Sequence, residues 1–122
     1  RPLSEVCPPE MSDAFPEEFT VEAGDYCIVK PRFSAFFSTQ LDLLLRRLGV
    51  DTVILAGTTT PNCIRTTCYD ALSLDYDVVV LSDCTSSVTD EVQSANLRDM
   101  ARIGARICTG AELPTLLGEA RA

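Results

Sequence analysis

Apolar residues along this chain fall alternately into short continuous runs and into stripes with helical spacing. The continuous runs predict buried strands at 26–30, 52–56, 77–81 and 105–108. The stripes, with their capping residues and terminal glycines, predict helices over 39–48, 61–74, 89–104 and 112–118. This alternation predicts a parallel sheet that is covered by helices on both faces.

Two segments follow neither pattern. Residues 1–24 contain recurring prolines and acids, which predict an irregular surface segment, and residues 82–87 are turn formers, which predict a loop. Functional sites of open parallel sheets lie beyond the C-terminal ends of the strands. Because Lys30, Cys63 and Asp83 each follow such an end, we expect them to converge on one edge of the sheet.

The stretch from Val53 to Thr67 carries the strongest chemical signal. It begins as a buried strand, continues as a threonine-rich turn and ends where a helix is predicted to start. Thr60 is the predicted N-cap and Pro61 the first helical residue, which places Cys63 in the first turn. Backbone N–H groups there lack intrahelical partners, and the helix dipole favours negative charge. Cys63 is therefore a candidate nucleophile, biased toward thiolate and beside donors for an oxyanion.

Composition narrows the class of protein. A length of 122 residues indicates one domain, and a net charge of −8 argues against nucleic acid and anionic membrane as partners. No apolar run approaches the ~18 residues that a membrane span needs. The sequence contains no histidine, so it cannot form a Cys–His couple or a histidine-containing zinc site. We expect neither a metal nor another cofactor.

Cysteine and lysine usage adds two observations. The six cysteines lack close CxxC pairs, and several fall inside apolar runs, which is typical of buried free thiols in a reducing cytosol and favours a cytoplasmic protein. The ten basic residues are nine arginines and a single lysine, Lys30. Lysine is a compact charge whose protonation shifts readily, whereas arginine stays protonated. Lys30 is therefore either a functional ammonium or a chance feature of an arginine-biased chain.

Several separate blocks of sequence resemble the isochorismatase-like cysteine hydrolases. These blocks are 30–36 with Thr39 and Leu41, 49–51, 56–63, Thr67, 70–71 and 82–83. The resemblance covers about residues 20–109. It implies a Rossmann-like three-layer α/β/α fold with a six-stranded parallel sheet in the order 3-2-1-4-5-6. It also implies hydrolysis of a small non-peptide amide through a thioester, by a Cys–Lys–Asp triad.

The resemblance also assigns catalytic roles to residues. Cys63 matches the nucleophile and Lys30 matches the triad lysine. The peptide between Thr58 and Thr59 matches a cis bond of the family, and the N–H groups of Thr59 and Cys63 match its oxyanion hole.

Four further residues are candidate substrate contacts, each with an alternative interpretation. Arg32 is a candidate for binding a substrate carboxylate, or else it is a solvated or salt-bridged arginine. Phe33 and Phe36 are candidate pocket walls, or else they pack in the core. Thr60 is a candidate substrate contact, with helix capping as the alternative.

The sequence departs from the family pattern before Lys30. The family's triad aspartate and its first two strands have no counterpart there, and neither do the histidines with which its nicotinamidase branch binds a metal. We therefore expect residues 1–122 to form the C-terminal portion of a single hydrolase domain. The first strands and the aspartate would lie in a missing N-terminal segment or on a partner chain, so these residues alone would be inactive. We also expect a homo-oligomer.

The sequence leaves two alternatives to an amidohydrolase open. A non-catalytic subunit or scaffold would keep the fold and have an unreactive Cys63. A redox-active thiol protein would need a resolving cysteine, and Cys68, about one and a half helical turns further on, points away from Cys63.

Overall fold

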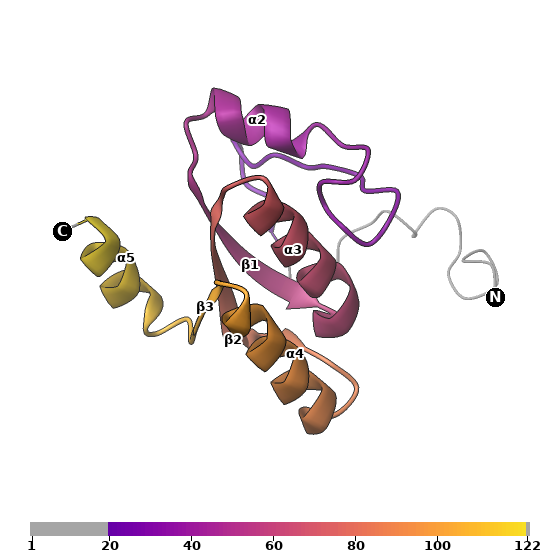
Figure 1. Ribbon diagram of the computed structural model, residues 1–122. Coiled ribbons are helices and arrows are strands. Elements are labelled where there is room, and N and C mark those ends of the chain that lie inside the picture. Colours follow the sequence, from indigo (N-terminus) through magenta and orange to yellow (C-terminus); the bar gives the residue numbers. More distant parts are fainter. Residues whose placement is uncertain (1–19, 122) are drawn as a thin grey trace.

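The structure, a computed structural model, describes residues 20–121 (Figure 1). The predicted irregular segment 1–24 therefore lies mostly outside the described residues, together with Cys7. The elements in chain order are α2 Leu41–Arg47, β1 Thr52–Thr58, η2 Thr60–Ile64, α3 Arg65–Ser73, β2 Asp77–Ser86, α4 Asp90–Arg102, β3 Arg106–Cys108 and α5 Leu113–Arg121.

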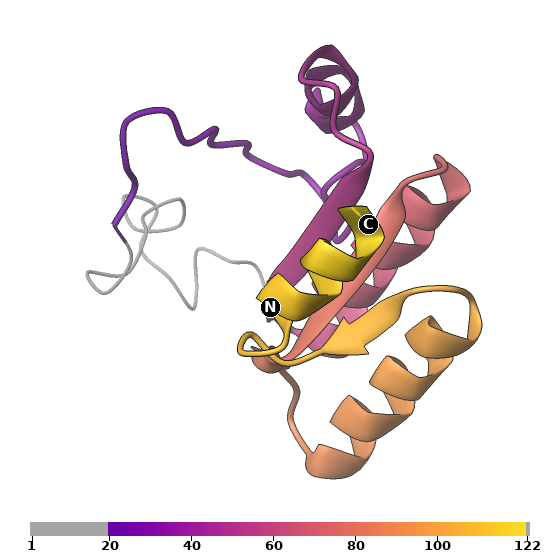
Figure 2. The ribbon, with the colours of Figure 1, turned by 90° about the vertical axis from the view of Figure 1, so that its left-hand side faces the viewer.

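The three strands form a parallel sheet in the order β1-β2-β3. Val78 and Val80 of the central strand β2 belong to a core cluster with side chains of α3 and α4, whereas Val79 and Leu81 pack with α5. Figure 2 shows α5 on the opposite side of the sheet from α4. The run 77–81 is continuously apolar because both faces of β2 are covered. The predicted α/β fold is thereby confirmed, and the three adjacent strands agree with positions 4-5-6 of the implied order.

The pairing of β1 with β2 contains an irregularity that the sequence did not predict. The ladder runs from Thr52–Asp77 to Leu55–Val80 and resumes at Gly57–Thr85. Ala56 therefore lies opposite the bulged residues 81–84, and the Thr85 hydroxyl donates to the Leu81 carbonyl oxygen across this bulge at 2.9 Å. The loop predicted over 82–87 is thus wrong in part, because turn-forming residues accommodate the bulge and β2 then pairs again as far as Ser86.

The predicted strand 26–30 is not a strand among the described residues. Tyr26 is 65% exposed and Val29 is 76% exposed. An apolar run becomes a strand only when another strand offers hydrogen-bonding groups, and none of the strands in the described part pairs with this segment.

The helices follow the predicted positions with shifted ends. α4 begins after Thr89, whose hydroxyl oxygen accepts a capping hydrogen bond from the Val92 N–H at 3.1 Å, in agreement with the helix predicted from residue 89. Gly49 follows α2 with a φ of 70°, in the left-handed region that favours glycine. No helix of the described residues combines the length and the apolar content that crossing a membrane requires.

The cysteines of the described part are all free thiols, as predicted. Cys68 and Cys108 are buried, but Cys27 and Cys84 are exposed. The prediction of burial is therefore wrong for these last two, because Cys27 lies in the unpaired segment 26–30 and Cys84 in the bulge of β2.

We expect amide hydrogen exchange to be slowest in β2 at Val79 and Val80, because these residues pair with β1 on one side and β3 on the other. Amides of 26–30 should exchange orders of magnitude faster. Peptide-resolved mass spectrometry of the exchange reaction measures both. Equal protection of the two segments would contradict the absence of 26–30 from the sheet.

Candidate active site

The candidate nucleophile lies on a short π-helical segment at the end of β1. The peptide bond between Thr58 and Thr59 is cis, and η2 begins at the next residue. Thr59, with φ −101° and ψ 146°, is the N-cap residue, and its side chain makes no capping hydrogen bond. Cys63 is therefore the fourth residue of η2, one turn after the strand.

The structure corrects the predicted capping role of Thr60. Its side chain is fully buried, and its hydroxyl donates to the Ser86 carbonyl oxygen at 3.1 Å. The N-cap position belongs to Thr59, and the substrate contact of Thr60 stays a prediction. Thr60 instead attaches η2 to the end of β2, because the single hydroxyl proton satisfies a carbonyl where the strand stops pairing.

Lys30 and Cys63 meet in the structure although 33 positions separate them. The Lys30 Nζ atom lies 3.3 Å from the Cys63 sulfur and donates to it, and it also donates to the Arg32 carbonyl oxygen at 3.2 Å. The second contact orients the ammonium group through the backbone of its own loop. The expected convergence of these two residues at one edge of the sheet is therefore observed.

The loop that carries Lys30 is attached to the helix that follows Cys63. The Ala35 N–H donates to the Thr67 hydroxyl oxygen of α3 at 3.0 Å, and the Thr39 hydroxyl donates to the Ala35 carbonyl oxygen at 2.5 Å. Thr67 is buried. These bonds limit the movement of the Lys30 loop relative to the helix, so the ammonium and the sulfur share one support.

Two of the candidate substrate contacts line one hollow. Arg32 and Phe33 border a cavity of about 610 Å³ between their loop and α3, together with Pro61, Arg65, Thr66 and Tyr69 among others. The Phe33 side chain is 60% exposed there. The Arg32 guanidinium donates to the Pro31 carbonyl oxygen at 2.7 Å, which leaves further N–H groups of its fork for another acceptor.

Phe36 lies elsewhere. Its ring stacks on Tyr76 with centroids 5.8 Å apart, and it packs against the core cluster that includes Val78 and Met100. It also borders a different hollow, between α2 and β1. This placement favours core packing over substrate contact for Phe36, because the ring contacts Tyr76 and the core cluster.

Asp83 lies at the same sheet edge but is engaged in a structural contact. Its carboxylate accepts a hydrogen bond from the Gly110 N–H at 2.9 Å and lies 3.5 Å from the Cys84 sulfur. The Gly110 bond holds the pKa of Asp83 below its ordinary value. Thr109 and Glu112 form a reciprocal capping box next to it, with N–H to oxygen distances of 2.9 and 3.2 Å. Asp83 therefore links the bulge of β2 to the turn before α5.

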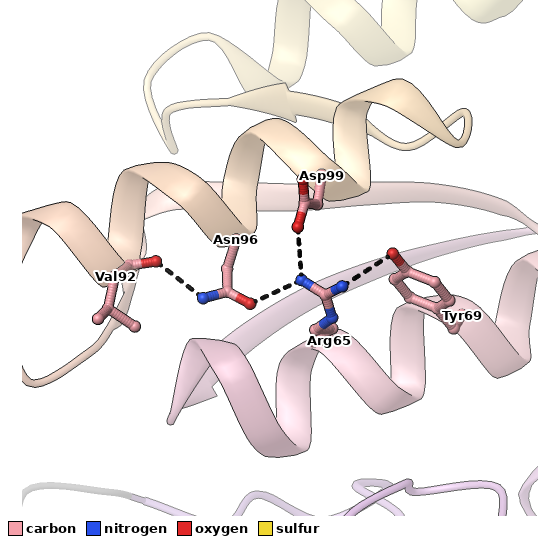
Figure 3. A network of polar contacts seen from close by, with 5 residues as sticks. All are labelled: Arg65, Tyr69, Val92, Asn96 and Asp99. Carbon is pink, nitrogen blue, oxygen red and sulfur yellow. Dashed lines mark hydrogen bonds and ion pairs between the residues drawn. The ribbon is translucent and has the colours of Figure 1, made fainter.

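Sequence reasoning missed a polar network between α3 and α4, which Figure 3 shows. The Arg65 guanidinium donates to Asn96 Oδ1 at 2.9 Å, to Asp99 Oδ2 at 3.0 Å and to the Tyr69 hydroxyl at 3.2 Å. Asn96 and Asp99 share one face of α4 at an i, i+3 spacing. That spacing was visible in the sequence, but nothing in it connected the pair to Arg65.

The described part of the chain contains no group of three or more cysteine, aspartate or glutamate side chains that could hold a metal ion. At the sheet edge, the thiol of Cys63 is in contact with the ammonium of Lys30. Fold and site together define the class: a parallel α/β protein with a cysteine–lysine pair beyond the C-terminal strand ends.

The family profile described as the Isochorismatase domain matches residues 3–112, so the chain belongs to this family. It is 51% identical over 89 residues to a "probable inactive nicotinamidase" of Arabidopsis thaliana, covering 72% of this chain and 45% of that protein. It is 39% identical over 87 residues to maleamate amidohydrolase of Pseudomonas putida, covering 71% and 41%.

A solved structure has a similar fold. An isochorismatase family protein from Desulfovibrio vulgaris matches with a TM-score of 0.79 and 45% identity, over 81% of this chain and 52% of that chain. The chain thus spans less than half the length of the two curated relatives and about half of this structure. The named relatives include amidohydrolases, which agrees with amide hydrolysis as the general activity of the family.

The contact between Asp83 and Cys84 gives a prediction. The Asp83 carboxylate accepts the thiol hydrogen bond and raises the pKa of Cys84, so less thiolate forms at neutral pH. Asp83→Asn should therefore increase the rate of Cys84 alkylation by iodoacetamide at pH 7.5, about two- to fivefold. Peptide mapping by mass spectrometry measures this rate.

The matched control is Glu112→Gln, which removes a neighbouring carboxylate that bonds Thr109 rather than the thiol. It should leave the Cys84 rate unchanged. An equal acceleration in both variants would show that general negative charge, and not the Asp83 hydrogen bond, suppresses the thiol.

Proposed function

We propose that the complete protein hydrolyses a small non-peptide amide by nucleophilic attack of Cys63. The observation that carries this proposal is the 3.3 Å contact between Lys30 Nζ and the Cys63 sulfur. An ammonium at this distance stabilises a negative sulfur electrostatically, and the thiolate is the form that attacks a carbonyl carbon. Membership of a family with named amidohydrolases supports the reaction class.

The proposed reaction has two stages. A carboxylate takes the thiol proton of Cys63, and the sulfur attacks the amide carbon to form a tetrahedral oxyanion. The backbone N–H groups of Thr59 and Cys63 are the proposed donors to that oxyanion, and removing one such donor typically costs about 3 kcal/mol. The C–N bond breaks, the proton leaves with the amine or ammonia, and water then hydrolyses the thioester to a carboxylic acid and free thiol.

The carboxylate of this scheme is proposed to come from a segment that adds to the free side of β1. Among the described residues β1 pairs only with β2. Ile54 is 41% exposed, and an apolar hollow of about 350 Å³ lies between β1 and α2. A strand in this position would pair the unpaired backbone groups and cover the hollow. The aligned part of the chain covers only about half of the named relatives, so they have residues available for such a strand.

The proposed substrate space is the hollow beside Arg32 and Phe33. An arginine fork at its wall favours a carboxylate on the substrate, and the aromatic rings of Phe33 and Tyr69 favour a flat apolar part. A small, flat amide that also carries a carboxylate would contact both the arginine and the aromatic rings.

A second candidate function is a non-catalytic subunit with the same fold. The relative named a probable inactive nicotinamidase favours it, because that protein is 51% identical over 89 residues. In this alternative Cys63 and Lys30 are retained for packing, and the sulfur shows no enhanced reactivity.

Turnover tests the first proposal. In the complete protein, Cys63→Ala should abolish ammonia release from a panel of small amides. Lys30→Arg should be nearly as damaging, because the larger guanidinium cannot occupy the position of the ammonium. Cys84→Ala, at an exposed cysteine of the β2 bulge, is the control and should retain activity. Substantial activity in Lys30→Arg would contradict the role of this lysine.

Reactivity of the thiol separates the two candidates. We expect iodoacetamide at pH 6 to label Cys63 at least tenfold faster than the exposed Cys27 in the same sample. Peptide mapping gives both rates at once. Equal slow labelling of the two cysteines would favour the non-catalytic subunit.

A further inference from the structure

We propose that Arg65 is a positioning residue for Cys63, and that it acts by attaching the start of α3 to α4. This inference rests on the proposed function, because it concerns how the cysteine is aligned with Lys30. Arg65 is the first residue of α3 and follows Cys63 by two positions. Its side chain points toward α4 and Tyr69 (Figure 3).

The contacts of Arg65 use both ends of the guanidinium. One terminal nitrogen donates to both Asn96 and Asp99 of α4, and the other donates to the Tyr69 hydroxyl. The guanidinium carbon lies 5.1 Å from the centroid of the Tyr69 ring, in a cation–π arrangement. Asn96 is itself oriented by its donation to the Val92 carbonyl oxygen at 2.8 Å. This fork geometry fixes the direction of the side chain, which a single flexible ion pair does not.

The position of this network gives it a consequence for Cys63. The π-helical segment η2 is held at its first residue by the Thr60–Ser86 hydrogen bond. Arg65 directly follows the last residue of η2, and its side chain is attached to α4. Cys63 therefore lies between two attachments, one to β2 and one to α4. α4 is in turn joined to β2 by Gln93, whose amide donates to the Thr85 hydroxyl and carbonyl oxygens at 3.0 and 3.2 Å. The two attachments of η2 are thus to elements, β2 and α4, that are themselves hydrogen-bonded to each other.

The alignment that these attachments protect is short. The Lys30–Cys63 contact is 3.3 Å long, so a shift of η2 by about 1 Å removes it. Displacements of that size at a reacting group commonly cost about a hundredfold in rate. π-helical turns are rare, and the hydrogen bond from the Ile64 N–H to the Thr59 carbonyl oxygen in this one is long, at 3.4 Å. Loss of the Arg65 attachment would let η2 relax at the end nearer to the sulfur.

The competing interpretation is an ordinary surface ion pair. The side chain of Asp99 is 48% exposed and that of Arg65 is 33% exposed, and such pairs often contribute little to stability. A stabilising pair alone predicts a lower melting temperature and an unchanged thiol. The positioning role predicts a change at Cys63 in a protein that stays folded.

The test uses the chain as it exists and measures iodoacetamide labelling of Cys63 by peptide mapping from pH 5 to 9. Arg65→Lys keeps the charge but not the fork, and Asp99→Asn keeps an acceptor oxygen but not the charge. Arg98→Lys makes the same arginine-to-lysine exchange at the residue before Asp99 in α4 and is the matched control. Lys30→Gln removes the ammonium and gives the labelling rate of Cys63 without it. Hydrogen exchange of β2 in each variant reports whether the fold persists.

We expect Arg65→Lys to slow Cys63 labelling at pH 6 about tenfold, toward the rate in Lys30→Gln. Asp99→Asn should act in the same direction with a smaller effect. The double variant should be no slower than Arg65→Lys, because both changes break one network. Arg98→Lys should match the unchanged protein.

The outcomes distinguish the two proposals. A Cys63 profile that depends on Lys30 but not on Arg65 or Asp99 overturns the positioning role and leaves the proposed function intact. A profile that does not depend on Lys30 overturns the proposed function itself. If Arg65→Lys loses protection in β2, then Asp99→Asn decides, and an unchanged profile in that folded variant overturns the positioning role.

Discussion

The coverage of β2 on both faces is the constraint on which the other features of this structure depend. Val78 and Val80 pack with α3 and α4, and Val79 and Leu81 pack with α5, so one apolar run joins the two layers. The strand then continues past its bulge to Ser86, where its carbonyl oxygen receives the Thr60 hydroxyl. The segment that carries Cys63 is thus attached to the most buried strand of the described sheet. A thiol can be both accessible and well oriented only when its backbone has such a support.

The parts of the fold that local patterns determine were predictable from the sequence. Continuous apolar runs located β1, β2 and β3, and helical spacing located α3. The meeting of Lys30 and Cys63 was expected as well, but on the premise that 26–30 is a strand, which the described residues do not show. Each of these predictions depends on a period or on a position within an element.

Features that depend on a distant partner were not predictable in this way. The segment 26–30 has strand composition, but pairing needs a neighbour that its own residues do not reveal. Thr60 is a residue type that commonly caps helices, yet its hydroxyl donates to the carbonyl oxygen of Ser86, 26 positions away. Arg65 joins residues 31 and 34 positions further on. A single sequence contains the hydrogen-bonding groups of all three but not the tertiary geometry that pairs them.

Chemical competence and substrate turnover place different demands on this fold. The sulfur and the ammonium are held by β2, by the Lys30 loop on Thr67 and by α4, all within the described residues. In the proposed reaction, proton transfer depends on a carboxylate on the free side of β1, which is apolar and exposed at Ile54. A relative that keeps the first set and alters the second would therefore retain a reactive cysteine without turnover. The name of the 51% identical Arabidopsis thaliana protein is compatible with that separation. Under the proposed function, reactivity of the thiol and release of the amine therefore have separate structural causes.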